Sequence, residues 1–269
     1  MRRSLLFVPG IDERKVRKST VIEADTVIID LEDSVPPNLK EAARGKIVEL
    51  LDELDWGDRE VCVRVNPLST LDAYRDLAVI GRLELDCIVL PKAETPPRDV
   101  YRATGMEVIA MIETPRGLLN IEEIASSEGV TGITWGPADL ALHIGGMENV
   151  LDDSDYLRIA VAVTAAAYDV DPIDKVYFNI NDPEGFKLDA LKAKRLGYVG
   201  KMVIHPNQVT LANQIFTPSR EEVEWAKRVV EAYEDAVKRG VGAVSLEGKL
   251  VDAVHYKLAK KLLDRIGRR

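Results

Sequence analysis

Short apolar segments alternate with amphipathic segments along most of the chain, and this alternation limits the possible folds more than any other feature. The apolar segments are rich in valine, isoleucine and leucine, as is typical of buried β-strands. Eight strands are expected, at residues 5–8, 26–31, 61–65, 87–90, 108–112, 132–135, 175–179 and 200–204. Because helical segments separate these strands, we expect them to form a parallel sheet.

Eight strand–helix units in 269 residues favour an α/β fold of the closed (β/α)8 TIM-barrel type over an open, doubly wound sheet. Such barrels commonly form one domain of about 250 residues. No Gly-x-Gly-x-x-Gly fingerprint follows a predicted strand, which counts against a dinucleotide-binding fold. The barrel is predicted at residues 1–218. Residues 219–269 are expected to add a C-terminal helical extension to the same domain, packed on the barrel or on a neighbouring subunit.

Composition excludes several classes of protein. The net charge of −9 argues against nucleic acid as the main partner, since contacts to phosphates need a basic surface. No apolar stretch approaches the roughly 18 residues of a membrane span, and the first apolar segment is too short for a signal peptide. Cys62 and Cys87 both fall in predicted strands and indicate buried thiols of a reduced compartment, not a disulfide. We therefore expect a cytoplasmic enzyme.

Charged and polar side chains follow most of the predicted strands, where the active sites of α/β barrels lie. They are Asp30, Glu32, Asp33, Arg64, Asn66, Lys92, Glu113, Arg116, Asp139 and His205. Glu113 and Asp139 follow successive strands, where an acid has no packing role. Because Mg²⁺ is typically held by one or two carboxylates and takes its other ligands from water and substrate, this pair predicts a Mg²⁺ site. It indicates an enzyme that stabilises an enolate or polarises a keto acid.

Each candidate also has a structural interpretation. Glu113 and Asp139 are acids that suit the first turn of a helix. Arg64 suits an ion pair with Glu32 or Asp33, or a substrate carboxylate, and the two roles are compatible. Asp33 suits a turn. Lys92 suits a solvated surface or an electrostatic role in the site, and a Schiff-base lysine is also consistent with such a barrel.

The motifs that carry these residues follow one another in a recognisable order. They lie at residues 3–10, 29–35, 64–66, 90–92, 112–117, 136–140, 200–208 and 248–252. In this order they resemble the citrate lyase β-subunit-like family of acyl-CoA lyases and aldolases over nearly the whole chain. No single motif is specific, but the series is specific for the family and not for one substrate.

The resemblance implies a TIM barrel that assembles as a homotrimer or as a hexamer of two trimers. It implies Mg²⁺ on Glu113 and Asp139, and Arg64 as the clamp for the carboxylate of a small oxo-acid. It implies a coenzyme A thioester, or a related acyl carrier, as the other half of the substrate. It also implies that Asp252, supplied by a neighbouring subunit, acts as acid and base.

Together these arguments predict a Mg²⁺-dependent lyase for a β-hydroxyacyl-CoA such as malyl-CoA or citramalyl-CoA, giving acetyl-CoA plus glyoxylate or pyruvate. The alternatives are the β subunit of a citrate lyase complex and a metal-dependent aldolase for free hydroxy-oxo-acids. A non-catalytic binding protein is disfavoured, because a decayed site would have lost at least one of these groups. The expected catalytic residues are Asp252, Arg64, Glu32 and Asp33, and the expected substrate-binding residues are Arg64, Lys92, Gly136, Pro137 and Ala138.

Overall fold

The computed structural model describes residues 1–267. The chain divides into two compact units, Arg2–Phe216 and Thr217–Arg269, and each is described by itself. The last two residues of the expected C-terminal extension, 268 and 269, lie outside the described residues.

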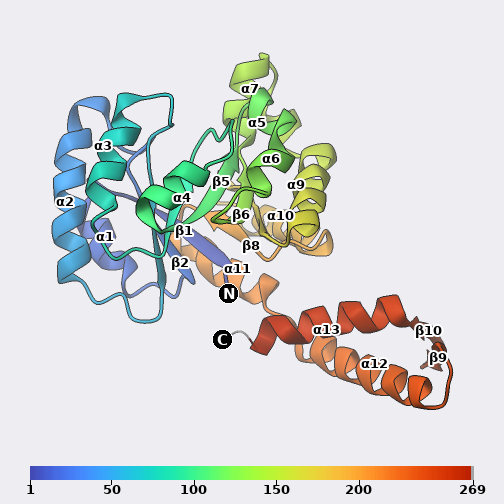
Figure 1. The fold of residues 1–269 in the computed structure, drawn as a ribbon. Helices are drawn as coiled ribbons and strands as arrows, with labels where there is room; N and C mark the ends of the chain where they lie inside the picture. Colours follow the sequence, from blue (N-terminus) through green and yellow to red (C-terminus); the bar gives the residue numbers. More distant parts are fainter. Residues whose placement is uncertain (268–269) are drawn as a thin grey trace. The chain divides into compact units, whose positions relative to one another are not determined.

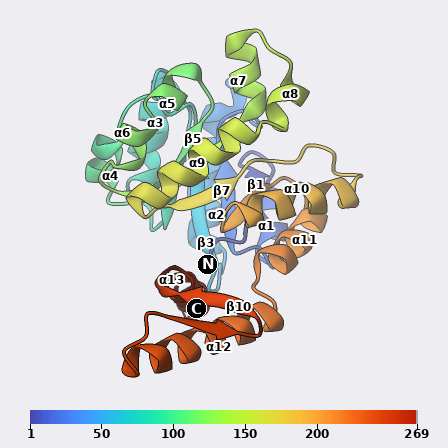
Figure 2. The ribbon, with the colours of Figure 1, turned by 90° about the vertical axis from the view of Figure 1, so that its right-hand side faces the viewer.

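The first unit is a closed barrel of eight parallel strands surrounded by helices (Figures 1 and 2). Its strands are β1 (Ser4–Pro9), β2 (Thr26–Asp30), β3 (Glu60–Arg64), β4 (Cys87–Leu90), β5 (Glu107–Ile112), β6 (Val130–Trp135), β7 (Asp171–Asp174) and β8 (Gly200–Val203). Each strand pairs with the next in sequence order, and β1 pairs with β8 to close the barrel. The predicted TIM barrel is confirmed.

Helices separate the strands of this unit, as expected. They are α1 (Glu13–Ser19), η1 (Pro37–Leu39), α2 (Lys40–Glu53), α3 (Leu71–Ile80), α4 (Arg98–Thr104), α5 (Pro115–Leu119), α6 (Ile121–Ala125), α7 (Pro137–Ile144), α8 (Glu148–Asp152), α9 (Asp155–Tyr168), α10 (Pro183–Arg195) and α11 (Pro206–Phe216). Local capping explains several boundaries: the side chains of Asp12, Thr70 and Ser154 each accept a hydrogen bond from the first turn of the helix that follows.

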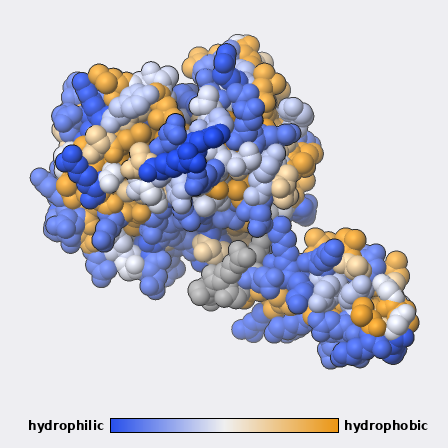
Figure 3. Space-filling model, in the orientation of Figure 1, coloured by the Kyte–Doolittle hydropathy of each residue, from blue (hydrophilic) through white to orange (hydrophobic). Residues whose placement is uncertain are grey.

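The surface in Figure 3 is mostly hydrophilic, with hydrophobic residues scattered among polar ones on the visible face. The exposed apolar side chains include Leu142 on α7 and Tyr156 on α9. Within residues 1–267, no helix has both the length and the apolar character needed to cross a membrane.

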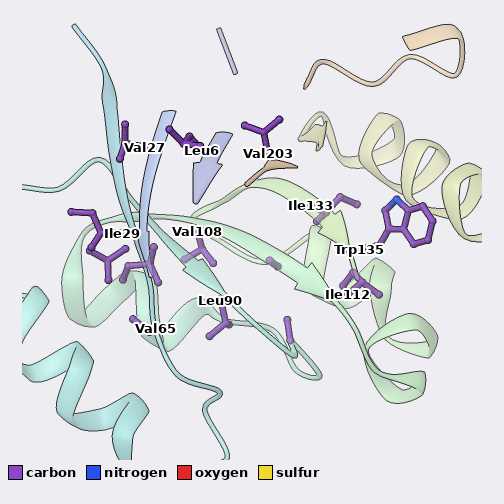
Figure 4. Close-up of a cluster of buried hydrophobic side chains, with 14 of the residues drawn as sticks. Leu6, Val27, Ile29, Val65, Leu90, Val108, Ile112, Ile133, Trp135 and Val203 are labelled. Atoms are coloured by element: carbon purple, nitrogen blue, oxygen red, sulfur yellow. The ribbon is translucent and has the colours of Figure 1, made fainter. Parts of the chain in front are cut away.

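The hydrophobic core has two layers. One cluster, which includes Leu5, Ile28 and Met202, is made of strand residues and fills the inside of the barrel. The other cluster lies between the strands and the helices, and Figure 4 shows part of it, with Leu6, Ile29 and other strand residues drawn as sticks. Residues of the two layers alternate along each strand because successive side chains point to opposite faces.

Charged side chains tie together the amino-terminal ends of the strands. Arg2 is 9% exposed and donates to the carboxylates of Glu60 on β3 and Glu107 on β5. Arg3 forms a two-bond ion pair with Asp25, just before β2, with Nε–Oδ2 and Nη2–Oδ1 distances of 2.7 Å each. These pairs lie at the end of the barrel opposite to the carboxyl ends of the strands.

The seventh strand differs from the prediction. It was expected at residues 175–179, but β7 is Asp171–Asp174, so that prediction was wrong. This strand contains Pro172 and two acids, which are rare in strands. Its Asp174 is fully buried because it forms ion pairs with Arg158 on α9 and Lys201 on β8. Ion pairing therefore replaces the apolar pattern that a sequence search detects.

The expectation of two free thiols was also wrong. Cys62 and Cys87 form a disulfide, and both are fully buried inside the barrel. The register of β3 and β4 places the two residues directly opposite each other. The sequence shows that both cysteines are in strands, but their alignment depends on strand register, which composition does not reveal.

The second unit consists of two long helices and a β-hairpin. These are α12 (Arg220–Lys238), β9 (Ala243–Leu246), β10 (Lys249–Asp252) and α13 (Ala253–Gly267) (Figure 2). The helices were predicted and the hairpin was not. Its turn contains Glu247 and Gly248, both with positive φ angles, as a tight two-residue hairpin turn requires. Val229 and Val251 are among the buried residues that join the hairpin to the helices.

Candidate active site

A cavity of about 870 Å³ opens within the barrel unit. Its lining includes Phe7 on β1, Arg64 on β3, and Met111 near the end of β5. It also includes Gly136, which joins β6 to α7, and Pro137 and Ala138, the first two residues of α7. All three were predicted to bind substrate. These residues lie at the carboxyl ends of the strands, where barrel enzymes place their active sites.

Arg64 forms an ion pair with Asp30, the last residue of the neighbouring strand. Arg64 Nε donates to Asp30 Oδ1 at 2.7 Å and Arg64 Nη2 donates to Oδ2 at 2.8 Å. Burial works against ionisation of Asp30, but the Arg64 guanidinium lowers the pKa of that carboxyl below its ordinary value. The structure therefore shows the ion-pair role of Arg64, and the cavity leaves it accessible to a ligand as well.

Glu32 lies between the two cations of the site. Its Oε1 accepts from Lys92 Nζ at 2.6 Å, and its Oε2 lies 3.0 Å from Arg64 Nη1. Glu32 is only 4% exposed. Burial raises the pKa of this carboxyl despite the opposing effects of Arg64 and Lys92.

Glu113 directly follows β5 and is also 4% exposed. Its Oε2 accepts a hydrogen bond from the backbone N–H of Lys92 at 3.0 Å. Lys92 has a φ of 46°, which is uncommon for a residue other than glycine and which helps to aim this N–H. Burial, followed by the negative charge of Glu32, raises the pKa of Glu113 to about 7.

Asp139 lies beyond the strand end at which it was expected. β6 ends at Trp135, and Asp139 is in the first turn of α7. Asp139 therefore occupies the first turn of a helix, the position that its alternative, structural role predicted. Its Oδ1 nevertheless lies 3.2 Å from Lys92 Nζ, which places it in the same cluster as Glu32.

The donor set of this cluster fits a divalent cation. Four acids, Asp30, Glu32, Glu113 and Asp139, accompany the two cations Arg64 and Lys92. Burial first, and the negative charge of Glu32 second, raise the pKa of the Glu113 carboxyl, and a nearby divalent cation would oppose both effects. Carboxylate oxygens are the preferred protein ligands of Mg²⁺.

Gly136 makes room for one of these acids. A Cβ atom at this position would lie 2.6 Å from Glu113 Oε1, closer than any normal contact. Any larger residue would therefore displace the Glu113 carboxylate. The position of the Glu113 carboxylate thus depends on the presence of glycine at position 136.

Three cations on α1 line the cavity and were not predicted as site residues. They are Arg14, Lys15 and Lys18. Arg14 and Lys18 are four residues apart, so they project from one face of the helix. A basic pair on the helix after the first strand was the available sequence signal. It was obscured because α1 is charged on most of its surface.

The remaining predicted residues are placed as follows. Asp33 lines the cavity, has a side chain that is 64% exposed and lies 3.9 Å from Arg64. Lys92 is absent from the described cavity lining, and its ammonium group faces Glu32 and Asp139.

Asp252 belongs to the second unit, at the end of β10. Its Oδ1 accepts from the N–H groups of Val254 and His255 and lies 2.7 Å from His255 Nδ1. The contact with His255 lowers the pKa of the Asp252 carboxyl. The structure thus gathers the other predicted catalytic, substrate-binding and metal-binding residues around the barrel rim and describes Asp252 within its own unit.

Of the further strand-end candidates, His205 lines the cavity. Arg116 is exposed, and the buried Asn66 donates to Asp76 and to the Leu31 carbonyl, so neither is among the described residues that line the cavity.

Two family models match the chain. Residues 3–206 match the model described as HpcH/HpaI aldolase/citrate lyase, and residues 154–267 match a carbon–carbon bond lyase of the TIM-barrel fold.

Individual proteins show the same similarity along the whole length. The mitochondrial citramalyl-CoA lyase of Mus musculus is 32% identical, with 97% of this chain and 85% of the mouse protein covered. Citrate lyase subunit beta of Escherichia coli is 35% identical, with 98% and 93% covered. Among solved structures, protein CitE of Mycobacterium tuberculosis in complex with magnesium, acetoacetate and coenzyme A has a TM-score of 0.82 at 31% identity, with 98% of each chain covered.

Proposed function

Because the chain belongs to the HpcH/HpaI aldolase/citrate lyase family, whose TIM-barrel members are carbon–carbon lyases, we propose that it acts on a β-hydroxyacyl-CoA with the help of Mg²⁺. The proposed substrates are malyl-CoA and citramalyl-CoA, which would give acetyl-CoA together with glyoxylate or pyruvate. The same site would catalyse the reverse condensation.

One observation carries this proposal: a single cavity joins the acidic cluster at the strand ends to the cations of α1. Glu113, Asp139 and Arg64 suit the metal and the carboxylate of an oxo-acid. Arg14, Lys15 and Lys18 suit the phosphate groups of coenzyme A, since lysine and arginine are the usual partners of phosphates. The magnesium, acetoacetate and coenzyme A of the Mycobacterium tuberculosis complex support the same combination of ligands.

Glu113 and Asp139 are the residues that would hold Mg²⁺. When bound, the ion supplies Lewis-acid stabilisation of negative charge on the substrate oxygens and orients the substrate.

The protein groups would bind the substrate and move its protons. Arg64 binds the carboxylate of the oxo-acid half. Glu32 and Asp33, both beside Arg64, are the candidates that take the proton of the substrate hydroxyl. When the carbon–carbon bond breaks, Asp252 delivers a proton to the carbon that becomes the methyl group of acetyl-CoA. General acid–base catalysis of this kind accelerates a reaction by about 10²–10⁴-fold.

The proposal extends to assembly and location. A homotrimer or hexamer would let Asp252 of one subunit serve the cavity of another, with residues 1–218 as barrel and 219–269 as the oligomerisation segment of the same domain. A cytoplasmic location is retained as part of the proposal. It no longer has the support of free thiols, since Cys62 and Cys87 form a disulfide.

The β subunit of a citrate lyase complex is the second candidate, favoured by the 35% identity to the Escherichia coli protein. Its substrate would be a citryl thioester on a carrier. Citryl has one more carboxylate than citramalyl. Among the described residues that line the cavity at the strand ends, Arg64 is the cation that a substrate carboxylate can meet. It already forms ion pairs with Asp30 and Glu32, so it has little capacity for a second substrate carboxylate. The citramalyl or malyl thioester therefore has the better charge balance.

The test is a substrate screen with purified protein and Mg²⁺. Malyl-CoA, citramalyl-CoA and citryl-CoA are offered in turn, and glyoxylate, pyruvate and oxaloacetate are measured. Release of glyoxylate or pyruvate is expected. Cleavage of citryl thioester alone would favour the second candidate. Cleavage of free hydroxy-oxo-acids that coenzyme A does not inhibit would favour the aldolase alternative.

A further inference from the structure

The guanidinium group of Arg64 is held on one edge before any ligand arrives. A guanidinium has five N–H donors in a fixed plane. Asp30 accepts from Nε and Nη2 of Arg64, which form the side edge of that plane. Glu32 lies 3.0 Å from Nη1. A ligand carboxylate can therefore reach only the hydrogens that remain at the end of the group.

Asp30 is itself fixed by the chain that follows it. Its Oδ1 accepts from the backbone N–H of Glu32 at 2.9 Å, and its Oδ2 accepts from the backbone N–H of Ser34 at 3.1 Å. Asp30 is 2% exposed. Each of its oxygens thus receives one backbone bond and one bond from Arg64. This arrangement leaves the carboxylate little freedom to rotate.

The ring of Phe7 lies against the guanidinium of Arg64. The central carbon of Arg64 lies 4.7 Å from the centre of this ring, within the range of a cation–π contact. Phe7 also lines the cavity. Asp30 thus fixes the edge of the group, and Phe7 restricts its tilt.

We propose that Asp30 and Phe7 are positioning residues that decide which edge of Arg64 meets the carboxylate of the oxo-acid. This inference rests on the proposed function, since it takes Arg64 as the carboxylate-binding group. Neither residue touches the substrate carboxylate. Both act through the orientation of Arg64.

The direct test is to measure oxo-acid binding to Asp30→Asn and Phe7→Leu. Binding of pyruvate and of glyoxylate, with Mg²⁺ present, is measured by calorimetry, and binding of coenzyme A is measured separately. Asp30→Asn is expected to weaken oxo-acid binding by about tenfold or more, because a charge-assisted two-bond pair is lost. Phe7→Leu is expected to weaken it by about 2–5-fold. Binding of coenzyme A is expected to stay within about twofold, because its proposed contacts are on α1.

The barrel offers a matched control for each variant. Asp25 forms the same two-bond pair with Arg3 at the opposite end of β2, so Asp25→Asn removes an equivalent ion pair away from the cavity. The ring of Phe186 lies 5.9 Å from Lys201 Nζ, so Phe186→Leu removes a ring beside another cation. Both controls are expected to change the melting temperature without changing oxo-acid affinity.

Each outcome bears on the inference. It is overturned if Asp30→Asn binds the oxo-acids like the wild type, or no worse than Asp25→Asn does. If Asp30→Asn does not fold, Asp30→Glu, which keeps the charge but shifts the carboxylate, is expected to show the same selective loss. If the wild type binds neither oxo-acid, the proposed function fails, and a crystal structure of the Asp30 variant decides the inference alone. A guanidinium that stays in its wild-type place would refute it.

Discussion

At the scale of single residues, the site is governed by charge balance. Asp30, Glu32 and Glu113 are almost fully buried, and Asp139 lies beside them. The two nearby cations, Arg64 and Lys92, are too few to neutralise these four acids. Burial, together with the negative charge of Glu32, raises the pKa of the Glu113 carboxyl to about 7. A bound divalent cation would remove the excess negative charge, which links metal binding to the protonation of this residue.

Glu113→Gln and Asp139→Asn are each expected to abolish turnover. Loss of a residue that supports a metal ligand typically costs 10–100-fold, so loss of a ligand is expected to cost more than about 100-fold. Mg²⁺ binding by calorimetry and activity are the measurements, with circular dichroism as the control for folding. A crystal soaked in Mg²⁺ that shows no ion between the two side chains would contradict the assignment.

The stability of the metal-free protein is expected to fall as the pH rises from about 5 to about 7. In the unfolded chain Glu113 ionises near its ordinary pKa of 4.5, whereas in the folded chain its pKa is about 7. Between these values the folded state binds more protons, so the free energy of unfolding decreases with pH. Urea denaturation at several pH values, with a chelator present, measures this slope.

The control for that slope is Glu113→Gln, which removes the titrating group and keeps its size. Its slope between pH 5 and pH 7 is expected to be shallower than that of the wild type. Glu32, whose pKa is also raised, contributes in the same direction and keeps part of the slope in the variant. If the stability of the two proteins changed equally with pH, the pKa of Glu113 in the folded protein would be its ordinary value.

Arg64→Lys is expected to weaken oxo-acid binding by about tenfold or more, since a point charge does not replace a planar fork. The lysine would also lose the two-bond pair with Asp30. The measurement is the affinity for pyruvate and glyoxylate. Lys40→Met is a suitable control because the Lys40 ammonium binds the backbone carbonyls of Leu31 and Glu32 in the same region. Wild-type affinity in Arg64→Lys would rule out the clamp.

At the scale of elements, the disulfide links β3, which carries Arg64, to β4, which precedes Lys92. It closes a segment with a sequence separation of 25. Reduction is expected to lower the free energy of unfolding by about 3 kcal/mol, mainly because the unfolded chain becomes less restricted. Urea denaturation of oxidised and reduced wild type measures this difference.

The variant Cys62→Ala/Cys87→Ala is the companion experiment to reduction. It is expected to lose somewhat more stability than the reduced wild type, because two buried sulfur atoms are also removed. Mg²⁺ binding is expected to persist, because the disulfide belongs to the apolar cluster inside the barrel and the acids lie at the carboxyl ends of the strands. Alkylation of both cysteines in the native, untreated protein would contradict the disulfide.

Most elements were predictable because apolar strands and capped helices carry local signals. The strand at 108–112 is an example, and β5 lies within one residue of that position. The failures have a common cause. β7 is defined by buried ion pairs and the disulfide by strand register, and both depend on partners that are distant in the sequence.

The acidic cluster was predictable for a different reason. The carboxyl ends of parallel strands meet at one rim, so acids that follow strands were expected to lie together. Chain order does not give the pairing within the rim. The two-bond ion pair between Asp30 and Arg64 and the ion pair between Lys92 and Glu32 could therefore be identified only from the structure.

At the scale of the whole molecule, the proposed assembly leads to a complementation experiment. Asp252→Ala and Glu113→Gln are each expected to be inactive. If Asp252 serves a neighbouring subunit, mixing the two variants under conditions that exchange subunits should restore part of the activity. Some sites would then combine an intact metal pair with an intact Asp252. Light scattering measures the oligomer, and mass spectrometry of a labelled variant verifies exchange. A fully active monomer, or no recovery after proven exchange, would exclude a shared site.

Closure of the barrel has a consequence for synthesis of the protein. β1 pairs with β2 soon after both have left the ribosome, but its other edge pairs with β8, about 200 residues later. At about 5–20 residues per second, that edge waits roughly 10–40 seconds for its partner. It exposes unpaired backbone groups throughout this time, and exposed strand edges promote aggregation. Synthesis is therefore a stage at which the open edge of β1 exposes the chain to aggregation, and chaperone supply and translation speed are conditions to control when the protein is produced.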